Sequence, residues 1–168
     1  MKKSNFICII VCAIFVALLG TLGHFFYEWS GNNPYVGMFF PVNESIWEHM
    51  KLFFFPALIC YLVLCFLKKD INPELVYTFP KAILLGTFLI PVLFYSYSGI
   101  LGYNISFLDI STFYISDLIS FIYLYKFAMS EKNTDYSYTY NISLLVCAFM
   151  FIYFTNNPPT LGIFAIPL

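Results

Sequence analysis

Long runs of hydrophobic residues alternate with short polar segments along the chain, and five of the runs are long enough to cross a membrane. A helix needs about 20 apolar residues to span the hydrocarbon core of a bilayer. Strands are not expected, because the runs are continuously apolar and longer than the alternating segments of about ten residues that form membrane barrels. The pattern therefore predicts an all-α polytopic membrane bundle. Its spans cover residues 5–28, 45–67, 80–101, 105–127 and 138–154.

Composition supports a membrane protein and excludes several other classes. Hydrophobic residues make up 61% of the chain and charged residues 10%, and the mean hydropathy is +0.81. An average soluble domain has about 25% charged residues. A soluble monomer, a disordered chain and a nucleic-acid binder, which needs a basic surface, are therefore not expected. Residues 1–168 are expected to form a single integral membrane domain with the lipid bilayer as its partner. The sequence leaves open whether the protein forms a homo-oligomer.

All eight basic residues are lysines, and their positions predict the orientation of the bundle. Lysine-rich loops remain cytoplasmic. With the N-terminus inside and the C-terminus outside, only Lys51 lies on the outer side. The inner lysines are Lys2, Lys3, Lys68, Lys69, Lys81, Lys126 and Lys132. Frequent Phe, Ile, Tyr, Asn and Lys are typical of an AT-rich bacterium, so we expect a multi-pass protein of the bacterial cytoplasmic membrane. The first pair of lysines also suits a signal peptide, but no small-x-small cleavage site follows.

Titratable residues outside the lysine-rich loops gather near the predicted outer ends of the first, second and fourth spans. This group consists of His24, Glu28, Glu44, Glu48, His49, Lys51 and Asp109. His24 and Glu28 are four residues apart and therefore stack on one face of a helix. A short loop makes the first two spans antiparallel neighbours, so the two histidines can approach each other at similar depth. Charged groups are costly within a membrane, which makes the group a candidate functional site.

The residue types of this group predict a metal-assisted hydrolase or transferase. Zinc is bound by histidine and carboxylate, and a catalytic site combines three protein ligands with an open position for water. The candidate ligands of a divalent metal such as zinc are His24, Glu28 and His49. The candidate catalytic residues are Glu44, Glu48, Asp109 and Lys51, with Glu44 or Glu48 as general base to a metal-bound water. A site at the outer leaflet suits a lipid-like substrate.

A polar stripe along the fourth span supports a second hypothesis, a small proton-coupled transporter. The stripe consists of Ser106, Asp109, Thr112, Ser116, Asp117, Ser120 and Tyr123. At 100° per residue these positions fall within an arc of about 140°. Such a stripe is expected to face the bundle interior or a wet cavity. Asp109 near the outer end and Ser116 and Asp117 near the midplane would form the polar path.

Structural roles and non-enzymatic functions compete with these hypotheses. Ser45-x-x-Glu48 fits a helix capping box, and Glu48 with Lys51 fits a simple ion pair. Trp29 and Trp47 are expected to anchor the bundle at the membrane interface. A non-enzymatic assembly or ligand-binding protein is a third hypothesis, and haem held between the two histidines is a fourth.

The stretch from His24 to Lys51 also carries a family resemblance. It contains His24-x-x-x-Glu28-Trp29-Ser30-Gly31-Asn32-Asn33 and Pro41-Val42-Asn43-Glu44-Ser45-x-Trp47-Glu48-His49-x-Lys51. Later motifs are Ser98-Gly99-Ile100-Leu101-Gly102 and Asp109-Ile110-Ser111. Over nearly its whole length the chain resembles a domain-of-unknown-function family of small polytopic membrane proteins from Gram-positive bacteria. The resemblance implies a polytopic membrane fold and no established activity.

Overall fold

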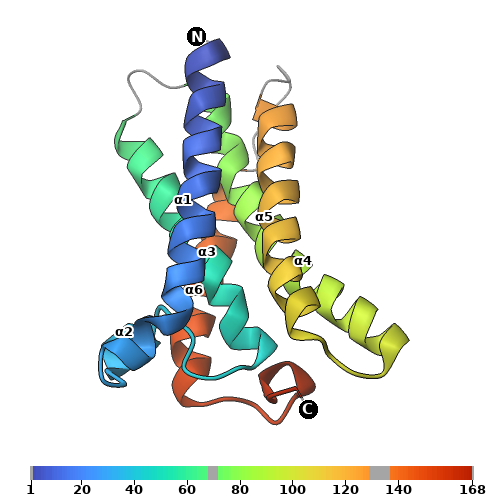
Figure 1. The fold of residues 1–168 in the computed structure, drawn as a ribbon. Coiled ribbons are helices and arrows are strands. Elements are labelled where there is room, and N and C mark those ends of the chain that lie inside the picture. The colour runs from blue at the N-terminus through green and yellow to red at the C-terminus, as the bar shows by residue number, and fades with distance from the viewer. Residues whose placement is uncertain (1, 68–71, 129–136, 168) are drawn as a thin grey trace.

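The computed structural model describes residues 2–67, 72–128 and 137–167, and these ranges contain helices and loops but no strand (Figure 1). The helices are α1 (Lys2–Trp29), α2 (Pro34–Gly37), α3 (Ile46–Phe66), α4 (Pro73–Leu101), α5 (Ser106–Ala128) and α6 (Ser137–Asn156), followed by the 3-10 helix η2 (Gly162–Phe164). Within the described ranges, five helices are long and apolar enough to cross a membrane. The prediction of an all-α fold with five such helices is confirmed.

The predicted spans agree with the apolar helices within two residues at every end except the start of α4. That helix begins at Pro73, and Pro80 and Pro91 lie inside it. The side chain of Asn72 caps it by accepting the N–H of Glu74 at 3.1 Å. Pro73 occupies the first turn of α4. The N–H groups of a first turn have no partner within the helix, so proline, which lacks an N–H, costs no helical hydrogen bond there. The helix thus begins seven residues before the predicted span, because membrane helices tolerate internal prolines when neighbouring groups satisfy the freed backbone.

The helices form one bundle around α3, which packs against α1 and α4. Helix α5 packs against α4 and α1, and α6 covers the side of α3 and α4. Phe53 and Phe54 of α3 are fully buried in the resulting core. Phe53 lies against Gly86 of α4, where a Cβ atom would be 2.4 Å from its ring. The two termini lie at opposite ends of the bundle, and the last turns of α4 diverge from α1 and α3 (Figure 1).

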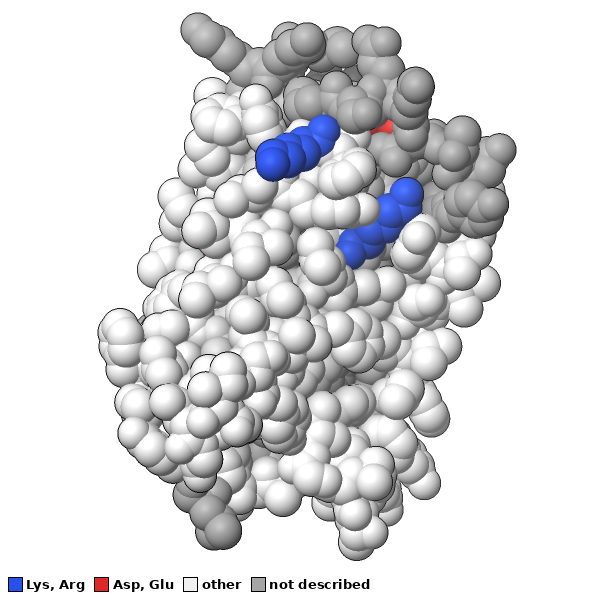
Figure 2. All heavy atoms as spheres, turned by 90° about the vertical axis from the view of Figure 1, so that its right-hand side faces the viewer, with Lys and Arg blue, Asp and Glu red and all other residues white. Residues whose placement is uncertain are grey.

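Charged side chains gather at one end of the molecule on the face shown in Figure 2, and the other described residues on that face are uncharged. The charged end is the one at which the chain begins. Lys81, near the start of α4, and Lys126, in the last turn of α5, lie toward this end. Lys68, Lys69 and Lys132 of the orientation argument lie outside the described residues, as do the side chains of Lys2 and Lys3.

Trp47 differs from the expected interface anchor. It is 8% exposed, whereas Trp29 is 66% exposed. The Trp47 ring packs against three phenylalanines of α6 and η2, with centroid distances of 4.7 Å to Phe151, 5.7 Å to Phe154 and 4.8 Å to Phe164. The expectation was wrong for Trp47, because α6 and the segment after it cover the start of α3.

Candidate metal site

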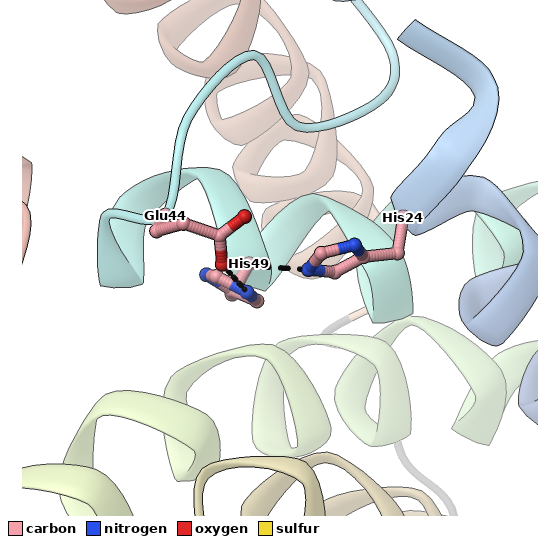
Figure 3. Close-up of side chains that lie close together, drawn as sticks. All are labelled: His24, Glu44 and His49. Atoms are coloured by element: carbon pink, nitrogen blue, oxygen red, sulfur yellow. Dashed lines mark ion pairs between the residues drawn. The ribbon is translucent and has the colours of Figure 1, made fainter. Parts of the chain in front are cut away.

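His24, Glu44 and His49 come together from three segments of the chain (Figure 3). His24 belongs to α1, Glu44 to the loop before α3, and His49 to the beginning of α3. The Nε2 atoms of His24 and His49 lie 3.5 and 3.3 Å from Glu44 Oε2. One possible ligand atom from each residue lies within 4.8 Å of the other two. Zn–N bonds are about 2.0–2.1 Å long, so this spacing suits one shared ion.

The loop before α3 fixes the position of Glu44 through hydrogen bonds on both sides. Asn43 Oδ1 accepts the N–H of Ser45 at 2.9 Å, and Ser45 Oγ accepts the N–H of Glu48 at 3.4 Å. The predicted cap at Ser45 is therefore present, but only half of the capping box forms. The carboxylate of Glu48 accepts the N–H of Val42 at 3.0 Å instead of turning back to Ser45.

A backbone hydrogen bond orients the ring of His49. Its Nδ1 lies 2.9 Å from the carbonyl oxygen of Ser45. A carbonyl only accepts hydrogen bonds, so Nδ1 carries the hydrogen and Nε2 is the atom that faces Glu44. This arrangement is typical of metal-binding histidines, in which the second ring nitrogen donates to a carbonyl or carboxylate. The His49 Nε2 atom is thus positioned to hold either a proton or a metal ion.

Glu44 has the charge state that a metal ligand needs. Its hydrogen bond with His49 lowers the pKa of the Glu44 carboxyl below its ordinary value of 4.5. The charge interactions with His49 and His24 act in the same direction, while partial burial opposes them. The group is therefore an ionised carboxylate at neutral pH, and its side chain remains 63% exposed.

Glu28 lies apart from the three clustered ligands. It is exposed on α1, one turn beyond His24, and the clustered carboxylate is that of Glu44. The shared helix face of His24 and Glu28 was a correct geometric expectation. The loop that returns to α3, however, brings Glu44 closer to both histidines.

The three residues line one edge of a pocket of about 520 Å³ between α1, α3, α4 and α5. Its walls are mainly apolar and include Leu52, Ile90, Phe94, Ile110 and Phe113. Ligand pockets are typically about 300–1,000 Å³ and combine apolar walls with a few polar groups. The pocket thus has both the size and the polarity of a site for an amphiphilic small molecule.

Asp109 of α5 lines the same pocket. Its carboxylate accepts hydrogen bonds from the hydroxyl of Tyr97 and, at 3.2 Å, from the side-chain amide of Asn104. These two partners hold the carboxylate in place beside the pocket. Sequence analysis missed both, although Asn104 immediately precedes the predicted fourth span and could have been recognised as a helix-start residue.

A model of one protein family matches residues 1–167. The chain belongs to the DUF6512 family. It is a family of unknown function, and comparisons with curated proteins and with solved structures find no match. The predicted resemblance is confirmed at this level. Membership assigns no activity to this DUF6512 protein.

Glu48 and Lys51 of the DUF6512 protein form a second, fully buried cluster. Lys51 Nζ donates to Glu48 Oε2 at 2.7 Å and to the carbonyl of Gly37 at 2.9 Å, and also contacts the hydroxyl of Thr155. The cluster therefore connects α3 with α2 and α6. Neither residue lines the pocket, and the arrangement matches the simple ion pair that competed with the catalytic prediction.

Ser116 and Asp117 are buried in α5 and do not line the pocket of the DUF6512 protein. They lie deeper in the bundle than Thr112, the pocket residue one turn earlier on the same helix. The predicted polar stripe therefore faces the interior of the bundle from Thr112 to Ser120, whereas Ser106 at its start is exposed.

Proposed function

We propose that this protein is a metal-dependent membrane enzyme, a hydrolase or transferase that acts on a lipid-like substrate. The supporting observation is the cluster of His24, Glu44 and His49, whose ligand atoms lie within 4.8 Å at the edge of an apolar pocket. Two histidines and a glutamate are a ligand set of catalytic zinc sites. When bound, such an ion activates a water molecule and polarises a carbonyl or phosphoryl oxygen.

The walls of the pocket support a substrate with an apolar chain. Phe94 and Phe113 line it together with aliphatic residues, while the polar groups lie at the metal cluster and at Asp109. A bound amphiphile would place its chain against the apolar walls and its polar group beside the histidines. Tyr97 and Asn104 hold the Asp109 carboxylate beside the pocket. Asp109 would act as the general base that accepts a proton from water or from the substrate.

The proposal places the metal cluster at the outer side of a bacterial cytoplasmic membrane. Two observations support this orientation. The cluster lies at the end of α1 opposite to the N-terminus, and Lys81 and Lys126 lie toward the N-terminal end. Lysine-rich segments are retained in the cytoplasm, which puts the N-terminus inside and the C-terminus outside.

Metal analysis of the purified protein tests the metal site directly. We expect one zinc ion per chain after incubation with zinc and gel filtration, and loss of that ion from both His24→Ala and His49→Ala. Absence of zinc from the wild-type protein, or unchanged zinc in both variants, would contradict the metal site.

The enzymatic part needs a separate assay. The zinc-loaded protein would be reconstituted into vesicles of phosphatidylglycerol and cardiolipin, and the lipids separated by chromatography after incubation. We expect new lipid products that are absent with His49→Ala and with the metal-free protein. A lipid profile that is identical with and without zinc-loaded protein would refute action on these bilayer lipids.

A further inference from the structure

In the middle turns of α4 and α5, three buried side-chain oxygen atoms have no hydrogen-bond partner among the described residues: Thr87 Oγ1, Ser116 Oγ and Asp117 Oδ1. Thr87 and Ser116 are 0% exposed, and Asp117 is 7% exposed. Buried polar groups in proteins are nearly always hydrogen-bonded, because an unsatisfied group loses its hydration without compensation. Three such atoms on two helices that pack together indicate a ligand.

The packing of α4 against α5 brings Thr87 to within about one helical turn of the level of Ser116. Ser120 Oγ donates to the carbonyl of Ala82 at 2.7 Å, and a Cβ atom on Gly86 would lie 3.0 Å from that of Ser120. The two helices run in opposite directions (Figure 1). One turn back from Ser120 along α5 is Ser116, and the residue after Gly86 along α4 is Thr87.

Pro91 adds a backbone oxygen at this level. Proline has no N–H, so the helical hydrogen bond from residue 91 to the carbonyl of Thr87 is not made. The carbonyl of Thr87 therefore lacks the partner it would have in a regular helix, and its hydroxyl has no partner among the described residues. In membrane transporters, carbonyls freed at interrupted helices coordinate Na⁺ or H⁺ near the middle of the bilayer.

The charge of Asp117 is not balanced by a cationic side chain within the described ranges. The ion pairs found there involve Glu44 and Glu48, and none includes Asp117. A buried carboxylate without a counter-charge is strongly disfavoured, and in membrane helices such groups pair or mark an ion path. A bound cation would balance the charge and give the unpartnered oxygens a ligand.

We propose that Thr87, Ser116 and Asp117 form a binding site for a sodium ion. The site offers one carboxylate oxygen, two hydroxyl oxygens and the freed carbonyl of Thr87, all of them hard ligands suited to a small hard cation. Ile90 and Thr112, one turn from Thr87 and Ser116, line the pocket. The ion therefore enters from the pocket side. This site shares no residue with the metal cluster, so it does not depend on the proposed enzymatic function.

Thermal unfolding in different salts tests the sodium site on the full chain purified in detergent. We expect saturating NaCl to raise Tm by about 5 °C or more relative to KCl or choline chloride at equal ionic strength. Asp117→Asn and Ser116→Ala should lose this difference. Ser111→Ala is the matched control on the same helix, because its hydroxyl already donates to the carbonyl of Phe107 at 2.7 Å, and it should keep the difference.

Binding of ²²Na⁺ gives a second readout that does not depend on unfolding. We expect one ion per chain in the wild-type protein and in His49→Ala, and at least tenfold weaker binding in Ser116→Ala. If Asp117→Asn does not fold, Ser116→Ala and Thr87→Val still decide the question. Equal Tm in all three salts together with no ²²Na⁺ binding would overturn the proposal, as would a sodium effect that persists in both of these hydroxyl variants. Retention by His49→Ala separates this site from the zinc site.

Discussion

His49 donates its Nδ1–H to the carbonyl oxygen of Ser45 at 2.9 Å, one helical turn earlier in the chain. The bond uses the carbonyl of the residue that also caps α3 with its side chain. The start of the helix and the orientation of the imidazole ring are thus determined by the same residue. Partners that orient metal-binding histidines typically contribute about 10–100-fold in metal affinity.

The first prediction compares Glu28, which lies near His24 in the sequence, with Glu44, which lies near His24 in space. Glu44→Gln should weaken zinc binding at least about tenfold, because it removes the only carboxylate among the clustered ligands. Glu28→Gln should leave the affinity unchanged, because Glu28 is exposed and outside the cluster. Competition with a zinc-binding dye measures both affinities. If Glu28→Gln weakens zinc binding more than Glu44→Gln does, Glu28 is a metal ligand and Glu44 is not.

The second prediction concerns the acid stability of the metal-free protein. The pKa of Glu44 is lower in the folded state than its ordinary value of 4.5, so the unfolded chain binds more protons in this range. Its contribution to stability is fully present above about pH 4.5 and is lost as the pH falls through the lower, folded value. The effect should remain below about 1 kcal/mol, because the side chain is largely exposed and screened by solvent.

Glu44→Gln should therefore lose less Tm than the wild-type protein between pH 5.5 and pH 3. Thermal unfolding at a series of pH values makes this comparison. A variant whose Tm falls as steeply as that of the wild-type protein would show that Glu44 is not coupled to the histidines.

The third prediction addresses the buried pair of Lys51 and Glu48. Lys51→Met leaves the Glu48 carboxylate buried without its cation and should lower the free energy of unfolding by about 3–5 kcal/mol. The double variant Lys51→Met/Glu48→Leu should recover most of this loss, since no buried charge remains. Lys126→Met is the matched control, because Lys126 is exposed, and it should change stability little. Unfolding of Lys51→Met at the wild-type denaturant midpoint would disprove a structural role for the pair.

The fourth prediction uses the close approach of α1 to its neighbours at Gly20. A Cβ atom there would lie 2.6 Å from the carbonyl oxygen of Leu52 and 2.5 Å from the ring of Phe113. Gly20→Ala should therefore destabilise the bundle by about 1–3 kcal/mol, because a backbone oxygen cannot move away as a side chain can. Gly99→Ala has no atom within 4 Å and should be neutral or slightly stabilising. Equal Tm values for the two variants would contradict the packing of α1 against α3.

The long helices could be predicted from sequence because each corresponds to an uninterrupted apolar run. The start of α4 could not be predicted, since Pro80 signals a boundary in most contexts and only the surrounding helices make it tolerable. Burial of Trp47 was likewise hidden, because its partners Phe151 and Phe164 lie about a hundred residues away in the sequence. Local patterns identify helices but not which helix covers which face.

The candidate site could also be predicted only in part from local sequence patterns. The approach of His24 to His49 followed from two helices joined by a short loop. The choice between Glu28 and Glu44 did not, because helical periodicity gives the direction of a side chain on its own helix and not the path of a returning loop. That path depends on hydrogen bonds such as the one from Ser45 N–H to Asn43 Oδ1.

The metal cluster also has an implication for how the protein is made. His24, Glu44 and His49 all belong to the first two long helices and the loop between them, whereas the pocket needs α4 and α5 as well. In the proposed membrane protein, all three candidate ligands would be present once this first helical hairpin has entered the bilayer. An ion captured at that stage would hold α1 against α3 and give the later helices a preformed surface on which to assemble.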